Sequence, residues 1–309
     1  MKAIYLTGNG GAESLHFGDI AKPQPKAGEV LIKVHATAIT PTELQWYPTF
    51  HTPSGETRSF PIVLGHEFSG VIETLGAGVD NFKAGDGVFG LNDWFANGAQ
   101  AGYCVAPVTV LAHKPRLLNH EQAAVVPISA LTAWQGLLEK TKLQAGQRVL
   151  IHGAAGGVGI FAVQLARWRG AQVIATASAA NLDFVRALGA HQVIDYHATR
   201  FEDLVRDLDV VFDAVGGETL QRSWNLLKSG GRLVTVATQS FGATEQRVRD
   251  AFMLVRPEVS QLKQIADLID AGEVRVFFER TFPLVQAREA YARAQQGKIR
   301  GKIVLAVGR

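Results

Sequence analysis

The spacing of hydrophobic positions changes near residue 120, and this change predicts two kinds of structure. Before it, short runs alternate apolar with polar residues or are rich in β-branched residues, and glycine or proline separates them. Examples are Glu29–His35, Gly70–Leu75 and Tyr103–Val110. Short strands at this close spacing are typical of antiparallel sheets that curl into barrels. The first third of the chain is therefore predicted to form a partly open β-barrel.

After residue 120, apolar strands alternate with helical segments. Asn119 can cap a helix over 120–140, which Pro127 interrupts. The predicted strands are Arg148–His152, Gln172–Ala177, His191–Ile194, Val210–Ala214 and Arg232–Ala237, with helices starting near Gly159, Asn181, Arg200 and Glu218. Such alternation favours a doubly wound parallel sheet with right-handed crossovers and helices on both faces. The fold class is α/β.

The last fifty residues are too few to form a domain of their own. They contain a helical pattern at Val259–Ala271, an apolar segment at Val274–Phe278, a helix around Val285–Gln296 and a strand at Lys302–Val307. We expect them to return to the first domain and complete it. The predicted domains are thus 1–119 completed by 258–309, and 120–257.

Composition narrows the function classes. The 309 residues include 31 basic and 28 acidic ones, a net charge of +3 without clustering, so neither nucleic acid nor an anionic membrane is expected as a partner. The single cysteine, Cys104, excludes a disulfide within the chain and any zinc site with two or more thiolates.

Two segments bear on location. The N-terminus lacks the apolar core of a signal peptide, and the uncharged stretch Val149–Ala166 contains four glycines. We expect a strand and a helix joined by a glycine turn there, not a membrane span. The expected location is the cytoplasm.

The glycine turn is the strongest chemical signal. Gly153, Gly156 and Gly159 follow a G-x-x-G-x-x-G spacing between a predicted strand and a predicted helix. A tight turn brings the backbone close to a pyrophosphate and aims a helix N-terminus at its charge. The turn, which includes Gly157 and Val158, therefore predicts a dinucleotide site.

The residues after the second strand of this predicted sheet indicate which dinucleotide binds. NAD sites usually place a carboxylate there to bind the ribose 2′-hydroxyl. Here no carboxylate appears before Asp183, and Ser178 can hydrogen-bond a 2′-phosphate, although 179–181 contain no lysine or arginine. NADP(H) is predicted, with weak or dual specificity as the alternative.

Short motifs in a fixed order cover almost the whole chain. They are Gly65-His66-Glu67-Phe68-Ser69-Gly70, Val71–Val79 (VIETLGAGV), Lys83-Ala84-Gly85-Asp86, Val88-Phe89-Gly90, Ala130-Leu131-Thr132-Ala133-Trp134, the Gly153–Gly159 turn, Val215-Gly216-Gly217-Glu218-Thr219-Leu220, Leu226–Arg232 (LLKSGGR) and Gly301-Lys302-Ile303-Val304-Leu305. In this order the chain resembles the medium-chain dehydrogenase/reductase superfamily, in its zinc-independent quinone oxidoreductase-like branch.

The resemblance implies a GroES-like catalytic domain and a Rossmann domain, with substrate and nicotinamide meeting in the cleft between them. It also implies roles for individual residues. Thr132 and Gly156–Val158 would contact the cofactor, Ser178 and Tyr196 would lie at the adenosine phosphate, and Val215 and Ala237 would flank the nicotinamide half. The run Phe252–Val255 resembles an edge strand used for dimerisation, so a homodimer is expected.

The same resemblance argues against a metal. In zinc-dependent relatives the histidine at position 66 is a ligand, and a cysteine ligand falls where this chain has Thr40. A catalytic zinc needs three protein ligands, and the four-cysteine structural lobe has no counterpart here. His66 is expected to be a hydrogen-bonded residue lining the cleft, with a direct polar role toward substrate as the alternative. Cys104 is expected to be a buried packing residue.

Without a Lewis acid, a quinone or an α,β-unsaturated carbonyl is easier to reduce than an alcohol is to oxidise, because hydrogen-bond donors can stabilise the charge on the conjugated oxygen. The candidate donors are Thr40, where this branch usually carries asparagine, and Tyr47, which can alternatively pack against the loop. Trp46, Phe50, Trp94 and Phe277 can form an apolar slot for a flat ring or ordinary packing, and His51 is expected to face solvent.

The predicted function is a metal-free, NADPH-dependent oxidoreductase acting on a small molecule, a quinone or an enone. Two alternatives remain open at this point. One is a metal-free alcohol or aldehyde oxidoreductase that uses His66. The other is a non-catalytic NADPH-binding regulatory protein, for which a clustered basic face would be the discriminating feature.

Overall fold

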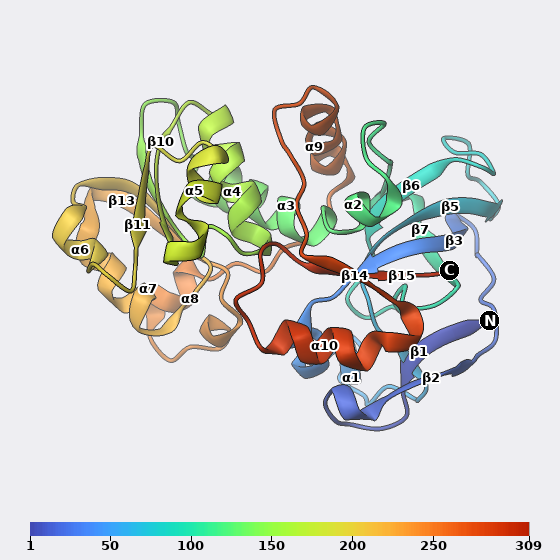
Figure 1. The fold of residues 1–309 in the computed structure, drawn as a ribbon. Coiled ribbons are helices and arrows are strands. Elements are labelled where there is room, and N and C mark those ends of the chain that lie inside the picture. Colours follow the sequence, from blue (N-terminus) through green and yellow to red (C-terminus); the bar gives the residue numbers. More distant parts are fainter. Residues whose placement is uncertain (309) are drawn as a thin grey trace. The chain divides into compact units, whose positions relative to one another are not determined.

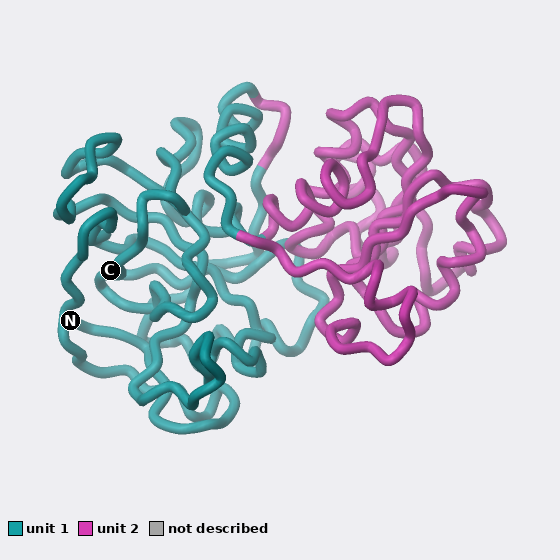
Figure 2. The backbone as a smooth tube through the Cα atoms, turned by 180° about the vertical axis from the view of Figure 1, so that it is seen from behind, with its two compact units in different colours: residues 1–128, 257–271, 276–309 teal, residues 129–256, 272–275 magenta. Residues whose placement is uncertain are grey.

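The computed structural model describes residues 1–308, which divide into two compact units (Figure 2). Unit 1 comprises Met1–Ile128, Pro257–Ala271 and Val276–Arg309, and unit 2 comprises Ser129–Arg256 and Gly272–Arg275. None of the helices in 1–308 is both long enough and apolar enough for a membrane span.

These units differ from the predicted ranges of 1–119 with 258–309, and 120–257, at three places, one of which is Pro257, a residue of unit 1. The first helix after residue 119 belongs to unit 1, because it packs on two strands of that unit. The segment Gly272–Arg275 belongs to unit 2, because Gln164 binds the main chain of Arg275 twice. Its Nε2 donates to Arg275 O at 2.9 Å, and its Oε1 accepts from Arg275 N at 2.8 Å.

Unit 1 is built mainly from antiparallel strands (Figure 1). They are β1 (Lys2–Leu6), β2 (Leu15–Asp19), β3 (Glu29–Ala38), β4 (Ile62–Val63), β5 (Glu67–Leu75), β6 (Gly87–Leu91), β7 (Tyr103–Pro107), β8 (Leu111–His113), β14 (Arg280–Pro283) and β15 (Ile303–Ala306). One sheet has the order β2-β1-β4, and the other has the order β14-β15-β3-β5-β6-β8 with β7 also paired to β3. Within the part of unit 1 that the structure describes, β14 and β15 are the one pair of strands that runs parallel.

Strand β3 organises unit 1. Its apolar residues are buried, and it pairs with β5 on one edge and with β7 and then β15 on the other. The helices of this unit are α1 (Tyr47–Phe50), α2 (His120–Ala124), α9 (Val259–Asp270) and α10 (Ala287–Gln295). Val274–Phe278 forms no strand, and β14 lies further along the chain.

Unit 2 contains the parallel sheet that the sequence predicts. Its strands are β9 (Arg148–His152), β10 (Gln172–Ala177), β11 (Gln192–Asp195), β12 (Leu208–Asp213) and β13 (Leu227–Thr235), in the order β11-β10-β9-β12-β13. Its helices are α3 (Pro127–Trp134, which begins in unit 1), α4 (Gly157–Trp168), α5 (Leu182–Ala187), α6 (Phe201–Leu204), α7 (Gly217–Ser223) and α8 (Gln246–Ala251). Helices flank the sheet on both sides (Figure 1). This strand order is that of a doubly wound nucleotide-binding fold.

The helical region after residue 119 forms as predicted. Asn119 accepts a hydrogen bond from Gln122 N at 2.8 Å, and Gln122 Oε1 accepts from Asn119 N at 3.0 Å, which completes a capping box. The helix ends after Ala124, and α3 restarts at Pro127. A π-helical turn then covers Gln135–Lys140.

The predicted edge strand at Phe252–Val255 is wrong for the single chain. Phe252 forms only an isolated parallel bridge to Thr235 in β13, and Met253 N donates to Thr235 O at 3.0 Å. The chain then leaves the sheet because Gln135 binds the main chain of Arg256, accepting from its N at 3.1 Å and donating to its O at 2.9 Å.

Candidate functional site

The glycine turn joins β9 to α4, and its glycines have different structural roles. Gly153 has φ +71°, which only glycine adopts without strain. A Cβ atom on Gly159 would lie 2.1 Å from Gly153 O, so this glycine lets α4 pack directly on the turn. A Cβ atom on Gly156 would meet the protein no closer than 3.3 Å. Gly156 therefore leaves room for a ligand.

The start of α4 fits the phosphates of a dinucleotide. Gly156 is the N-cap residue, and no side chain caps the helix there. The N–H groups of the first turn, which include those of Gly157 and Val158, thus have no capping side chain. Such groups, together with the helix dipole, bind phosphate.

The predicted nicotinamide-side residues lie next to this turn. Val215 follows β12 and is 46% exposed, and its Cγ2 would lie 3.3 Å from a Cβ atom on Gly153. Ala237 follows β13, and its Cβ would lie 2.8 Å from one on Gly216. The carboxyl ends of β9, β12 and β13 thus bring these segments together, as parallel strands do at a nucleotide site.

The predicted adenosine-side residues follow β10 and β11, which are neighbours in the sheet. Tyr196 N donates to Ala177 O at 3.3 Å, so the ends of the two strands lie side by side. Ser178 Oγ accepts from Asn181 Nδ2 at 3.1 Å, and the exposed Tyr196 ring lies 4.3 Å from that of His197. Thr132, the remaining cofactor candidate, lies in α3 and is almost fully buried.

Sequence reasoning missed Asp213, the last residue of β12. Its carboxylate is fully buried and accepts from Val215 N and Gly216 N at 3.0 Å, and from Thr235 Oγ1 at 2.7 Å. It therefore fixes the turn that presents Val215. The sequence signal that could have indicated this role is a carboxylate at the end of an apolar strand.

His152, the last residue of β9, was missed as well. Ser223 Oγ donates to Thr219 O at 2.6 Å, so it accepts from His152 Nε2 at 2.9 Å. Nδ1 of the same ring then accepts from Thr176 Oγ1 at 3.0 Å. Burial lowers the pKa of His152 to about 4, so the ring is neutral near pH 7. It links β9, β10 and α7 directly behind the glycine turn.

In unit 1, Thr40 belongs to a buried polar cluster. Lys302 Nζ donates to Thr40 Oγ1 at 3.0 Å and forms an ion pair with Glu67 Oε1. Glu67 Oε2 accepts from Ile128 N at 2.9 Å. Burial raises the pKa of Glu67, while the ammonium of Lys302 opposes that rise. The Thr40 oxygen accepts a hydrogen bond from Lys302. The hydroxyl proton of Thr40 therefore remains available to donate to another partner.

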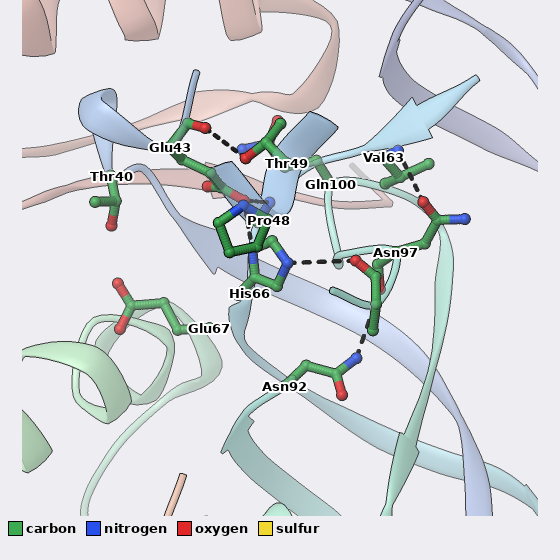
Figure 3. Close-up of polar contacts among 12 residues, drawn as sticks. Thr40, Glu43, Pro48, Thr49, Val63, His66, Glu67, Asn92, Asn97 and Gln100 are labelled. Atoms are coloured by element: carbon green, nitrogen blue, oxygen red, sulfur yellow. Dashed lines mark hydrogen bonds and ion pairs between the residues drawn. The ribbon is translucent and has the colours of Figure 1, made fainter. Parts of the chain in front are cut away.

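His66 pairs with Glu43 in the same unit (Figure 3). Its Nδ1 lies 2.6 Å from Glu43 Oε1, which also accepts from Gly65 N at 2.7 Å, and its Nε2 lies 3.3 Å from Ala96 O. The prediction that His66 is hydrogen-bonded agrees with this geometry. However, the residue is only 1% exposed and both ring nitrogens face acceptors, so the geometry does not favour the alternative of a direct role toward substrate.

Within residues 1–308, the His, Cys, Asp and Glu side chains form no group of three or more that could hold a metal ion. Cys104 is buried as predicted, and burial raises the pKa of its thiol.

The aromatic candidates separate into two groups. Trp46 and Trp94 meet edge to face with ring centroids 5.0 Å apart. Phe50 packs against the apolar core of unit 1, and the Phe277 carbonyl lies close to Gly301.

Tyr47 is 51% exposed and stacks on His51 at 4.1 Å. Tyr47 is thus accessible to solvent, and His51, predicted to face solvent, is half-buried.

This chain is similar in sequence and structure to several proteins named as oxidoreductases. Residues 26–116 match the family described as "Alcohol dehydrogenase GroES-like domain", and residues 188–305 match "Zinc-binding dehydrogenase". A "Probable zinc-binding oxidoreductase, mitochondrial" of Arthroderma benhamiae is 33% identical over 92% of this chain and 90% of its own length.

"NAD(P)H oxidoreductase RTN4IP1, mitochondrial" of Danio rerio is 32% identical over 90% of this chain and 84% of its own length. Among solved structures, the quinone oxidoreductase from Coxiella burnetii superposes with a TM-score of 0.90 at 33% identity. The match covers 100% of this chain and 99% of that one.

These relatives agree with the fold and with the glycine turn. The protein is an oxidoreductase that uses a nicotinamide cofactor. The chain belongs to the medium-chain dehydrogenase/reductase superfamily, in its zinc-independent quinone oxidoreductase-like branch.

Proposed function

We propose that this oxidoreductase uses NADPH to reduce a quinone or an α,β-unsaturated carbonyl without a metal ion. The observation that carries the proposal is the Thr40 hydroxyl. It accepts a hydrogen bond from the ammonium of Lys302 at 3.0 Å and keeps its proton for a substrate oxygen.

When bound, NADPH supplies a hydride, so that NADPH, one proton and a quinone give NADP⁺ and a hydroquinone, and an enone gives the saturated carbonyl compound. The residues of this chain bind the cofactor, orient the substrate and stabilise the charge that develops on it. The glycine turn and the start of α4 hold the phosphates, and Val215 and Ala237 flank the nicotinamide half.

Negative charge develops on the substrate's conjugated oxygen as the hydride arrives. The Thr40 hydroxyl donates a hydrogen bond to that oxygen, and Lys302 increases the acidity of the hydroxyl by binding its oxygen. The hydroxyl of the exposed residue Tyr47 is the second donor. Solvent supplies the proton that completes the product.

The choice of NADPH over NADH rests on the end of β10. No carboxylate lies between Ala177 and Asp183 to repel a 2′-phosphate. Ser178 and Asn181 offer polar atoms there, and the exposed rings of Tyr196 and His197 lie beside the end of the strand. No basic residue occupies 179–181, so the proposed preference for NADPH is modest.

We also propose that the protein forms a homodimer in the cytoplasm. Phe241 and Leu254 are large exposed residues close to β13, and Leu254 is 57% exposed. Within 1–308, β13 is the last strand of its sheet on that side. A second copy can pair there. Light scattering after size-exclusion chromatography should give twice the chain mass, and Leu254→Glu should give a monomer.

The test of function is oxidation of NADPH or NADH, followed by absorbance, with 1,4-benzoquinone, but-3-en-2-one or propanal, each with and without chelator. The proposal expects faster oxidation of NADPH with the first two substrates and no effect of chelator. Thr40→Val should lower kcat by about 100- to 1000-fold, the effect of removing one donor to an oxyanion. Thr42→Val, a half-buried neighbour in the same loop, is the matched control.

Activity restricted to alcohols or aldehydes and abolished by chelator would refute the metal-free mechanism. Tight NADPH binding with no turnover of any substrate would favour a regulatory protein. Equal rates for the Thr40→Val variant and the wild type would remove Thr40 from the mechanism.

A further inference from the structure

We infer that Arg58 is a positioning residue that holds Trp46 and Trp94 in a fixed arrangement and thereby makes the enzyme favour flat, ring-bearing acceptors over small open-chain enones. The inference rests on the proposed function, because it concerns which quinones or enones that site accepts.

Arg58 lies in the connection between α1 and β4 and is half-buried. Its guanidinium donates four hydrogen bonds, two to helix α1 and two to the loop after β6. Nη1 donates to Pro48 O at 3.2 Å and to Thr49 O at 3.4 Å. Nη2 donates to Ala96 O at 3.4 Å and to Asn97 Oδ1 at 2.9 Å. One side chain thus connects α1 to the loop after β6.

These contacts belong to a closed ring of hydrogen bonds that passes through the Glu43–His66 pair. Thr49, which binds Arg58 through its carbonyl, donates from its hydroxyl to Glu43 O at 2.6 Å. Glu43 Oε1 lies 2.6 Å from His66 Nδ1. His66 Nε2 then lies 3.3 Å from Ala96 O, the carbonyl that Arg58 also binds. Figure 3 shows the part of this ring that contains Glu43, Thr49 and His66.

The two tryptophans lie on the segments that this ring joins. Trp46 lies between Glu43 and Thr49 in the chain, with Trp46 N donating to Glu43 O at 3.3 Å and Thr49 N donating to Trp46 O at 3.2 Å. Trp94 lies two residues before Ala96. Its ring centroid is 5.0 Å from that of Trp46 and 5.5 Å from that of His66.

Both ends of the Trp94 loop are anchored. Asn92 Nδ2 donates to Val105 O at 3.0 Å at one end. At the other end, Asn97 Oδ1 accepts from both Arg58 and Val63 N, the latter at 3.3 Å. Asn97 and Ala96 therefore help to hold the loop that carries Trp94, and Arg58 binds both of these residues.

A perpendicular pair of indoles selects by shape. Aromatic rings attract one another edge to face or offset-stacked, and the gain depends on their relative orientation. A fused-ring quinone gains from such a surface, whereas a four-carbon enone has no ring to place against it. Lysine cannot replace Arg58, because an ammonium lacks the planar fork that reaches both segments at once.

The test compares Arg58→Lys with Arg293→Lys. Arg293 is also a half-buried arginine of unit 1, and it donates to Gly297 O at 3.0 Å and pairs with Glu279. Steady-state kinetics are measured with 2-methyl-1,4-naphthoquinone and with but-3-en-2-one, together with the Kd of NADPH. Asn97→Ala, which removes one acceptor of Arg58, provides a second variant if Arg58→Lys does not fold.

We expect Arg58→Lys to lower kcat/KM for the naphthoquinone by about tenfold and for the small enone by less than about threefold, with the Kd of NADPH unchanged. Arg293→Lys should leave kcat/KM unchanged for both acceptors. An equal fall for both acceptors, which simple destabilisation would produce, refutes the inference, and so does no change.

A wild-type enzyme that reduces neither acceptor would refute the proposed function instead. The role of Arg58 is then decided by acrylamide quenching of tryptophan fluorescence, which needs no substrate. Greater quenching in Arg58→Lys than in Arg293→Lys supports the positioning role, and equal quenching overturns it.

Discussion

Replacing Gly159 and Gly156 with alanine should separate folding from nucleotide binding. At Gly159 the new methyl group would lie 2.1 Å from Gly153 O and 2.7 Å from Ala154 Cα, both backbone atoms that cannot rotate away. The turn or α4 must shift. Overpacking of this kind costs about 1–3 kcal/mol. For a unit of this size that cost lowers Tm by roughly 2 to 12 °C.

At Gly156 the same methyl group has different neighbours. Its nearest protein atom would be Gly153 O at 3.3 Å, and φ is −78°, which alanine adopts readily. The folded protein should therefore tolerate Gly156→Ala, with Tm changed by less than about 2 °C. The methyl group instead occupies the space where the pyrophosphate approaches the backbone, so the Kd of NADPH should rise at least about tenfold.

The assay combines thermal unfolding, followed by circular dichroism, with titration of NADPH against intrinsic fluorescence. Gly146→Ala is not a suitable control because that residue has φ +78°. Gly8→Ala is suitable, because a Cβ atom there meets nothing within 4 Å and its φ is not positive. If Gly156→Ala bound NADPH as tightly as the wild type, the pyrophosphate could not lie against this glycine, and the assignment of the turn would be refuted.

Two further predictions concern buried charges. Folding lowers the pKa of His152 to about 4, so the unfolded chain binds a proton on this ring at a higher pH than the folded chain does. The free energy of unfolding is therefore at its full value above about pH 6.5. It falls by up to about 3 kcal/mol as the pH drops toward 4. Urea unfolding at several pH values should show this slope reduced in His152→Gln; an unchanged slope contradicts it. Lys302→Met leaves the buried Glu67 without its cation and should cost about 3–5 kcal/mol. Adding Glu67→Gln should recover much of that loss in the same urea experiment, and a Lys302→Met variant as stable as the wild type would contradict the pairing.

The parallel sheet and the glycine turn could be predicted from the sequence because their signals are local. A strand followed at once by G-x-x-G-x-x-G and an apolar helix places φ-restricted and close-packed positions within seven residues. In the structure Gly153 has a positive φ and Gly159 is closely packed, and both are positions where the G-x-x-G-x-x-G spacing predicts a glycine. Ser178, Tyr196, Val215 and Ala237 each come just after a strand of this sheet, but the roles of Tyr196, Val215 and Ala237 were implied by the resemblance to the family and not by a local signal.

Partners far apart in the sequence could not be predicted in this way. Lys302 meets Glu67 across 235 residues because β3 carries β15 on one edge and β5 on the other. The apolar run Phe252–Val255 predicts an edge strand. In the structure Gln135, 121 residues earlier, binds the main chain of Arg256, and the chain leaves the sheet there.

The sequence by itself determined the α/β class, the nucleotide turn and most residues near it, since backbone conformation and hydrophobic periodicity act over a few neighbouring residues. Only the tertiary structure decided which polar side chains share a buried environment. It enclosed His66 with Glu43, left the Thr40 proton available by placing Lys302 against its oxygen, and set Arg58 between α1 and the loop after β6. Those contacts depend on strand register, and register is set by the packing of the whole unit.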